Sequence, residues 1–291
     1  RKKVKYGTAN FAKGPAMSRQ EAAQAIWYGI EKVEELSKKG ICLIGTGEMG
    51  IGNTTTSSAI TAVLLGQSVE EVTGRGAGLS SEGLERKIKT IQKGIQLNQP
   101  NKEDVLDVLS KVGGLDIAGL VGVFLGCSYY KIPVVVDGFI ATVAAFCAMK
   151  IQPNSKDYLL ASHTSKEQGA KKILGILGLK PMIDGDLCLG EGSGAVLLFP
   201  LLDMAVKIFL EMETFDGFIC FPENRLEFYL KNHQGYYNTY HSLSKKPIEG
   251  DISNTKKFIA HIFGEQTEIG FDYLQLLYLK PTQILPILCL V

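Results

Sequence analysis

Residues 43–56 read LIGTGEMGIGNTTT, and this stretch decides the fold. An apolar run at 41–44 precedes it, and from Ser57 onward the apolar residues follow a helical pattern. Four glycines lie between them: Gly45, Gly47, Gly50 and Gly52. A strand, a glycine-rich turn and a helix are typical of an open α/β sheet, whose ligands bind at such turns. Because glycines let a backbone approach a ligand and helix N-termini attract anions, the stretch predicts a phosphate-bearing substrate.

Two generic motifs nearly match this turn. The spacing of Gly45, Gly47 and Gly50 is that of a dinucleotide-binding fingerprint, and acidic residues follow at 70–71, as that fingerprint requires. Glu48, however, would place a carboxylate where the pyrophosphate binds. The turn also resembles a P-loop, but Asn53 stands where the phosphate-binding lysine is needed. A tight turn that only closes a strand onto a helix would use the same glycines.

The stretch resembles the signature of the nicotinate-nucleotide–dimethylbenzimidazole phosphoribosyltransferase family. Other segments resemble the same family in the same order: 7–18 (GTANFAKGPAMS), 74–79 (GRGAGL), 112–122 (VGGLDIAGLVG), 132–145 (IPVVVDGFIATVAA), 158–165 (YLLASHTS) and 189–205 (LGEGSGAVLLFPLLDMA). The resemblance covers about residues 4–214. Several separate motifs in the right order are far more specific than one glycine pattern.

The resemblance implies an activity in cobalamin lower-ligand synthesis. Nicotinate mononucleotide would transfer its phosphoribosyl group to 5,6-dimethylbenzimidazole, which gives α-ribazole 5′-phosphate and nicotinate with inversion at the anomeric carbon. The leaving nicotinate is activated by its own pyridinium charge, so no metal or redox cofactor is expected. The family also implies a homodimer.

Composition excludes several other classes of protein. The net charge is +1, so nothing indicates nucleic acid or an anionic membrane as a partner. A hydrophobic content of 45% and 32 glycines suit a globular α/β protein. The six cysteines are scattered without metal-ligand spacing and are interpreted as reduced core residues of a cytoplasmic protein. No signal peptide or uninterrupted membrane-spanning segment is identified.

Alternating patterns predict an α/β fold with a doubly wound, mainly parallel sheet and helices on both faces. Strands are expected at 41–44, 133–136 and 158–161. A capping box at 18–21 starts the first helix, which Gly40 can end. Further helices are expected over 57–64, 82–97, 105–109, 117–130, 140–149, 165–175 and 195–212, with a loop at 69–78. Glycines at 119, 122 and 126 predict close helix packing.

Two domains are expected: a nucleotide-binding and catalytic domain at 1–214 and an unmatched tail at 215–291. The tail holds 13 of the 25 aromatic residues but only 5 of the 32 glycines. We expect it to be irregular and poorly ordered, and a translated non-coding stretch is favoured over a lineage-specific extension. The N-terminal part of the family fold is expected to be missing, which predicts that this chain alone is poorly soluble or inactive.

Two glutamates are the candidate catalytic residues. Glu191 matches the family's general base, which takes a proton from the benzimidazole as its other ring nitrogen attacks the ribose. Burial would raise the pKa of this carboxyl and a helix N-terminus would lower it, and the sequence leaves that balance open. Glu48 matches a family residue at the nucleotide, where negative charge favours a cation-like transition state. Either glutamate could instead bond only to nearby backbone N–H groups.

The other candidates are substrate-binding residues: Gly47, Gly50, Gly52, Asn53, Thr54, Arg75, Gly76, Lys87, Ser162, His163, Gly190 and Gly192. Arg75, Gly76 and Lys87 match phosphate-side elements, although a lone lysine on a helix is usually solvated surface. His163 has no acidic partner nearby in sequence, so a nucleophilic triad is not expected. Asp137 follows a buried strand and could face a ligand or cap the turn at Gly138.

Two rival functions remain open at this point. One is a non-catalytic, nucleotide-binding remnant of the enzyme, and the other is a nicotinamide-cofactor dehydrogenase that uses the fingerprint of the central stretch. Binding of nicotinate mononucleotide rather than NAD would exclude the dehydrogenase. If the chain is a phosphoribosyltransferase, the turns at 45–54 and 185–194 should lie together at the carboxyl edge of the sheet, with Glu48 and Glu191 at one site.

Overall fold

The computed structural model describes residues 2–76, 78–165, 167–185, 187 and 191–211, together with the backbone of three strands between 217 and 238. The chain forms two compact units, Arg1–Lys207 and Ile208–Val291. The boundary expected from composition, after residue 214, stays a prediction.

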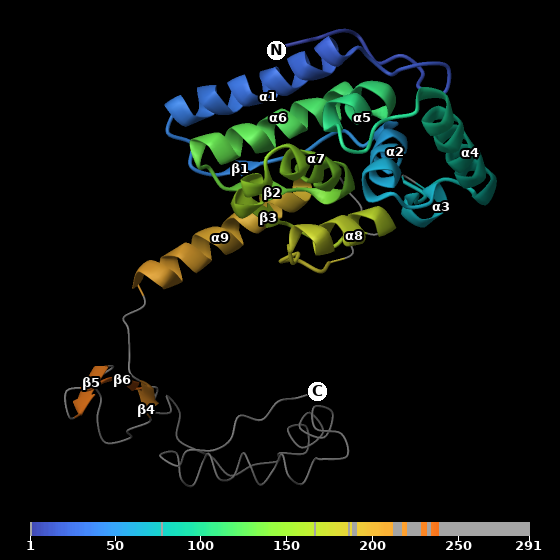
Figure 1. The fold of residues 1–291 in the computed structure, drawn as a ribbon. Coiled ribbons are helices and arrows are strands. Elements are labelled where there is room, and N and C mark those ends of the chain that lie inside the picture. The colour runs from blue at the N-terminus through green and yellow to red at the C-terminus, as the bar shows by residue number, and fades with distance from the viewer. Residues whose placement is uncertain are drawn as a thin grey trace, which may run out of the picture. The chain divides into compact units, whose positions relative to one another are not determined.

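Helices make up most of the first unit (Figure 1). Two of them, α1 (Arg19–Lys38) and α6 (Leu115–Tyr130), lie side by side. The others are α2 (Asn53–Leu65), α3 (Val69–Val72), α4 (Ser81–Asn98), α5 (Val105–Val112), α7 (Gly138–Ile151), the 3₁₀ helix η1 (Pro153–Tyr158), α8 (Gln168–Leu177) and α9 (Ser193–Glu211).

The loop predicted at 69–78 is wrong at its start, where α3 forms one helical turn. Val69 and Val72 are three residues apart, so they lie on one helix face, and both are buried. Glu70 and Glu71 lie in the first turn, where negative charge is favourable to the helix dipole. A segment this short shows too little periodicity to be recognised in the sequence.

Helix α1 begins at the predicted capping box. The Glu21 N–H donates to Ser18 Oγ at 3.1 Å, and the Ser18 N–H donates to Glu21 Oε2 at 2.8 Å. These bonds satisfy N–H groups that have no partner within the helix. The same carboxylate accepts from Lys5 Nζ at 2.8 Å, which ties the N-terminal residues to the helix.

Glycines bring α1 and α6 into very close contact. A Cβ on Gly122 would lie 1.9 Å from Ile26 O, and a Cβ on Gly29 would lie 2.2 Å from Gly119 O. Neither space admits a methyl group without moving a backbone. The close packing predicted for the glycines of α6 is confirmed at Gly122 and Gly126, whereas a Cβ on Gly119 would meet nothing nearer than 4.0 Å. Gly29 is the partner on α1 that the sequence pattern did not reveal.

We expect Gly122→Ala to lower the free energy of unfolding by about 1–3 kcal/mol, because the added methyl group meets a backbone carbonyl. Urea denaturation followed by the fluorescence of Trp27, which lies on α1, measures the change. Gly175→Ala on the exposed face of α8 is the matched control, since nothing lies within 4 Å of its Cβ. It should stabilise the protein by about 0.5–1 kcal/mol. An unchanged midpoint for Gly122→Ala would contradict the close contact.

Three short parallel strands form the central sheet of the first unit. They are β1 (Ile44–Gly45), β2 (Val134–Val136) and β3 (Leu159–Ala161), in the order β1-β2-β3. The central strand, β2, is buried along its whole length. The register aligns the carboxyl ends of the three strands at one edge of the sheet. Residues that follow the strands are therefore brought together there.

Helices cover both faces of this sheet, as predicted. Side chains on β2 point alternately to opposite faces. Val134 and Val136 join the main hydrophobic core, whereas Val135 packs in a second cluster with Ala195 and Leu198 of α9. Figure 1 shows α6 and α7 on one side of the strands and α9 on the other. The predicted α/β fold is confirmed.

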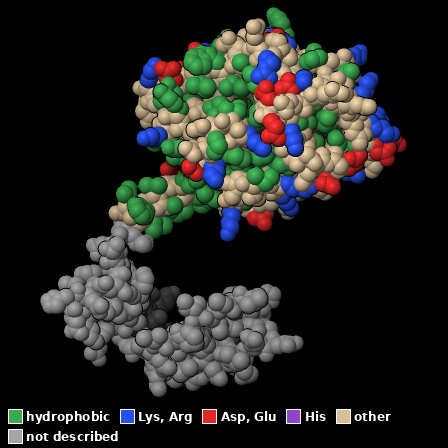
Figure 2. All heavy atoms as spheres, in the orientation of Figure 1, with side chains coloured by type: hydrophobic (Ala, Val, Ile, Leu, Met, Phe, Trp, Pro, Cys, Tyr) green, Lys and Arg blue, Asp and Glu red, His purple; other side chains and the backbone are tan. Residues whose placement is uncertain are grey.

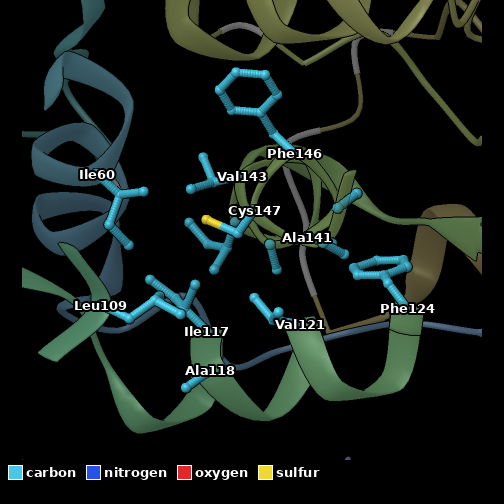
Figure 3. Packing of buried hydrophobic residues seen from close by; sticks show 14 of the residues in the cluster. Ile60, Leu109, Ile117, Ala118, Val121, Phe124, Ala141, Val143, Phe146 and Cys147 are labelled. Carbon is cyan, nitrogen blue, oxygen red and sulfur yellow. The ribbon is translucent and has the colours of Figure 1, made fainter. Parts of the chain in front are cut away.

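The main core surrounds α7. Figure 3 shows Ile60 of α2, Leu109 of α5 and Ile117 of α6 beside Val143 and Cys147 of α7. All five side chains are fully buried. Burial of this apolar surface stabilises the unit and holds the strand ends in place.

The cysteines only partly match the expectation. Cys127 and Cys147 are buried, and burial raises the pKa of each thiol to about 12. Cys42 is exposed instead, because it precedes the buried part of β1. Cys188, Cys220 and Cys289 lie outside the described residues.

Helix α9 is long and apolar enough to cross a membrane by length and composition alone. Its window Ser193–Leu210 has a mean hydropathy of 1.8 and is 17% buried. The sequence pattern predicted a helix here and no membrane span, and one such helix is weak evidence for a span. In Figure 2, hydrophobic side chains cover much of α9, and Val196, Leu197, Met204 and Val206 are each more than half exposed.

The described part of the second unit contains three strands. They are β4 (Gly217–Ile219), β5 (Phe228–Lys231) and β6 (Gln234–Asn238); β4 runs parallel to β6, and β5 runs antiparallel to it. The expectation of an irregular tail is wrong for these residues. Two aromatic-rich segments separated by two residues are typical of a tight hairpin, and this pattern was overlooked in the sequence. The rest of 215–291 lies outside the described residues.

Candidate active site

The two glycine-rich turns meet at the carboxyl edge of the sheet. The Glu191 N–H donates to Glu48 O at 3.0 Å. A Cβ on Gly47 would lie 2.5 Å from Gly192 N, so only glycine fits between the turns. The prediction that these turns lie together is therefore confirmed for their described residues.

The Glu48 carboxylate bends back onto its own turn. Its Oε2 accepts from the Gly50 N–H and from Asn53 Nδ2, the latter at 2.6 Å. Gly50 and Gly52 have φ values of +79° and +80°, in the left-handed region that favours glycine. The glycines let the turn close around the carboxylate, which two donors orient and which stays half-buried.

Asn53 links Glu48 to a second carboxylate. Its Nδ2 also donates to Asp116 Oδ2 at 2.8 Å, so both amide hydrogens are used. Its Oδ1 is buried and has no hydrogen-bond partner among the described residues. Asp116, in the first turn of α6, is thus part of the site although it was not selected from the sequence. There it is one acidic residue at the start of an apolar helix, a common position for structural reasons alone.

Glu191 has an unusual backbone conformation. Its φ is +66°, a left-handed value that is uncommon for a residue with a Cβ. Its side chain is exposed to solvent. The peptide groups on both sides are held: its own N–H bonds to Glu48, and the Gly192 N–H donates to Asp137 Oδ2 at 2.9 Å. Gly190, also predicted to bind substrate, lies outside the described residues.

Asp137 does not cap the turn at Gly138. It occupies the N-cap position of α7, but its side chain makes no capping bond there. The carboxylate is directed instead to Gly192, at the start of α9. Burial raises the pKa of Asp137, while His163 and the backbone N–H groups of the α9 start act in the opposite direction.

His163 has an acidic partner after all, supplied by the neighbouring strand. Its Nδ1 lies 3.5 Å from Asp137 Oδ1 and 3.0 Å from Ser162 Oγ. The Ser162 hydroxyl donates to Val136 O at 2.8 Å, so it must accept from His163, and the network assigns a hydrogen to Nδ1. Ser162 and Asp137 both lie at Nδ1 of His163, and the Ser162 hydroxyl is buried. These three residues therefore do not form a nucleophilic triad.

Lys87 is buried, contrary to the usual place of a helix lysine. It is 7% exposed, and its Nζ donates to Thr54 Oγ1 and to Gly74 O, each at 3.0 Å. Burial lowers the pKa of Lys87, and the negative charge of Glu167 opposes this effect. Both hydrogen-bond partners are neutral, and among the described residues the third ammonium hydrogen makes no hydrogen bond, so it can bind an anion. Thr54 adjoins Asn53 on α2, and the first turn of this helix therefore joins Lys87 to the two glutamates.

The loop after α3 completes this side of the site. Gly76 has a φ of +56°, and its N–H donates to Glu167 Oε1 at 2.9 Å. A Cβ on Gly76 would lie 2.9 Å from Thr54 Oγ1. Arg75 does not join Lys87: its guanidinium donates to Leu79 O at 2.7 Å and to Ser81 Oγ at 3.1 Å. Glu167, like Asp116, was not selected from the sequence.

The site offers carboxylates, N–H groups and a buried ammonium. Among the described residues, no group of three or more His, Cys, Asp or Glu side chains is placed to hold a metal ion. The arrangement suits a ligand that has an anionic end at Lys87 and a reacting centre near Glu48 and Glu191.

A family model described as phosphoribosyltransferase matches residues 1–217. The chain belongs to this phosphoribosyltransferase family. The resemblance recognised in the sequence motifs is thereby confirmed. The glycine motif misleads for a reason that the geometry gives: in a dinucleotide site the second glycine lets the pyrophosphate approach, whereas here Gly47 gives room to the Gly192 backbone, which lies 2.5 Å from where a Cβ would be.

Several phosphoribosyltransferases are similar to this chain over most of its length. The protein named nicotinate-nucleotide–dimethylbenzimidazole phosphoribosyltransferase in Alkaliphilus metalliredigens is 55% identical over 215 residues, which are 74% of this chain and 62% of that protein. Its namesake in Clostridium acetobutylicum is 54% identical over 216 residues, 74% of this chain and 61% of that protein. The chain thus matches less than two thirds of the length of these relatives.

Solved structures are also similar to this chain. The crystal structure of CobT from Thermus thermophilus matches with a TM-score of 0.69 and 43% sequence identity, over 74% of this chain and 64% of that one. This likeness supports the α/β phosphoribosyltransferase fold described above.

Proposed function

We propose that this chain contributes the nucleotide side and the general base of a nicotinate-nucleotide–dimethylbenzimidazole phosphoribosyltransferase. The single observation that carries the proposal is the contact between the two turns, in which the Glu191 N–H bonds to Glu48 O at 3.0 Å. It supports a shared site for two carboxylates, one half-buried and oriented, the other exposed.

The phosphate of nicotinate mononucleotide would bind at the start of α2. This helix has Gly52 at its N-cap without a side-chain capping bond, so its first N–H groups are open to an anion. Lys87 adds a positive charge beside Thr54 in the same turn. Gly76 contributes a loop that approaches this turn closely. A monophosphate suits one cation and a few backbone N–H groups.

The two glutamates would divide the chemistry. One benzimidazole nitrogen attacks C1′ of the ribose, the bond from C1′ to nicotinate breaks, and its electron pair neutralises the pyridinium. The proton on the other benzimidazole nitrogen passes to Glu191 as general base. Glu48, oriented by Asn53, places negative charge near the cation-like anomeric centre. Gly47, Gly50, Gly52 and Gly192 shape the turns, and His163, which bonds to Ser162, lies beside Asp137 at the same edge of the sheet.

The rival is a nucleotide-binding protein without transferase activity. The chain spans 62% of the length of one of the two relatives above and 61% of the other, and binding without transfer by this part of the enzyme is the second candidate. The resemblance further supports a homodimer and a cytoplasmic location. Exposed apolar residues on α9 are consistent with a self-association surface, and sedimentation of the purified chain tests that part.

Binding and turnover separate these functions. Calorimetry with the purified chain should detect nicotinate mononucleotide in preference to NAD. Adding 5,6-dimethylbenzimidazole and following α-ribazole 5′-phosphate by mass spectrometry then measures transfer. Product formation supports the enzyme, and binding without product supports the nucleotide-binding rival. Failure to bind the mononucleotide, or a preference for NAD, would overturn the proposal.

A further inference from the structure

Asp137 is a buried carboxylate to which the reaction above gives no role. It follows the central strand β2 directly and is 4% exposed. Burying a charged group is unfavourable unless bonds compensate for the lost water. The groups that surround its carboxylate therefore indicate what it does.

The carboxylate lies at the first turn of α9. Its Oδ2 accepts from the Gly192 N–H at 2.9 Å, and the N–H groups of Gly194 and Ala195 act to lower the pKa of the carboxyl. The Val196 N–H donates to Gly192 O at 3.0 Å, which makes Gly192 the N-cap of α9. A helix N-cap normally supplies a side-chain oxygen, and glycine has none. Asp137 supplies that oxygen from another strand.

Neighbouring strands hold Asp137 in this position. The Asp137 N–H donates to Thr46 Oγ1 at 3.3 Å, and this hydroxyl donates to Val135 O at 2.8 Å. On the other side, His163 Nδ1 lies 3.5 Å from Asp137 Oδ1, an oxygen that accepts no hydrogen bond from the described residues. A Cβ on Gly194 would lie 2.3 Å from the same oxygen, so α9 sits directly against the carboxylate.

Glu191 is held by its two adjacent peptide groups. Its own N–H bonds to Glu48 O, and the N–H of the next residue, Gly192, bonds to Asp137. Between these two anchors Glu191 adopts its left-handed φ of +66°. Such a conformation persists where the surroundings impose it. Without the second anchor, the peptide that follows Glu191 could rotate and redirect its side chain.

We propose that Asp137 is a positioning residue for Glu191: it caps α9 from the end of β2 and thereby sets the direction of the Glu191 side chain. The mechanistic part rests on the proposed function, because it takes Glu191 to be the general base. The structural part does not.

Hydrogen exchange of the intact chain tests the structural part without any turnover. Asp137→Asn is expected to accelerate amide exchange at Glu191 and Gly192 by at least about tenfold, because a charged acceptor is lost. Amides of α6 should keep their protection. Asp157→Asn, at an exposed aspartate in η1, is the matched control and should leave the amides of the α9 start unchanged.

A second variant, Asp137→Ser, is measured in parallel. The serine side chain is too short for its hydroxyl to reach the Gly192 N–H, and because serine is smaller than aspartate it introduces no clash. If one variant loses amide protection throughout the chain, that variant is unfolded. The proposal is then judged from the amide exchange of the other variant. Local acceleration at the start of α9 in a folded variant supports the proposal. Unchanged exchange at Glu191 and Gly192 in a folded variant overturns it.

A double-mutant cycle tests the mechanistic part. Asp137→Asn should lower kcat by about tenfold or more while the KM for nicotinate mononucleotide changes by less than about twofold. In a Glu191→Gln background it should lower kcat no further, because Asp137 acts through Glu191. Equal losses in both backgrounds would overturn the positioning role. Wild-type turnover by Glu191→Gln would instead overturn the role of Glu191 in the proposed function, and the exchange result would still stand.

Discussion

Replacing Glu191 with glutamine is expected to lower kcat for α-ribazole 5′-phosphate formation by about 10²–10⁴-fold, because a positioned general base is removed. The glutamine side chain has nearly the same shape, and the backbone bond from residue 191 to Glu48 O is retained. The turn should therefore keep its structure. Affinity for nicotinate mononucleotide, measured by calorimetry, should stay within about twofold of the wild-type value.

Glu85→Gln is the matched control for this substitution. Glu85 is an exposed glutamate on α4 and touches neither turn. Both variants lose one carboxylate, so a general effect of net charge would lower both rates equally. Wild-type kcat for Glu191→Gln near neutral pH would remove Glu191 from the mechanism.

Replacing Lys87 with methionine is expected to weaken nicotinate mononucleotide binding by about 10–100-fold, since a hydrogen bond to a charged group contributes about 1.5–3 kcal/mol. Methionine keeps the length of the apolar stem. Nicotinate riboside, which lacks the phosphate, should bind to the variant and the wild-type protein equally well. An equal loss of affinity for both ligands would contradict a phosphate contact.

The same substitution has a predictable effect on stability. Burial lowers the Lys87 pKa below its ordinary value of 10.5, so the charged form is less favourable in the folded protein than in the unfolded chain. The destabilisation is complete below the folded pKa and disappears as the pH rises from there toward 10.5. Urea denaturation should therefore show that the stability of Lys87→Met relative to wild type falls as the pH rises from neutral through this window. Lys89→Met, exposed on the same helix, should show no such trend.

Local sequence patterns determined most of the helices and strands, and they identified the two glycine-rich turns of the site. The capping box at Ser18 and the buried strand at 134–136 depend on residues close together in the chain, so they can be recognised there. The glycines at 45–52 likewise indicated a turn where a backbone must pass closely. Family motifs then predicted that Glu48 and Glu191 share a site. Short or atypical elements, such as α3 and the strands after residue 216, were overlooked.

Only the tertiary structure decided how the groups of the site are paired. Asp137 bonds to Gly192, Asn53 bonds to Asp116, and Lys87 lies buried against Thr54, although these partners are far apart in the chain. Their residue types are ordinary: an aspartate after a strand, an aspartate at a helix start and a lysine on a helix. What distinguishes them is the shared edge of a parallel sheet, where strands and turns from distant segments end together. Long-range packing sets the burial and the direction of such side chains. The local periodicity of the sequence does not reveal this packing.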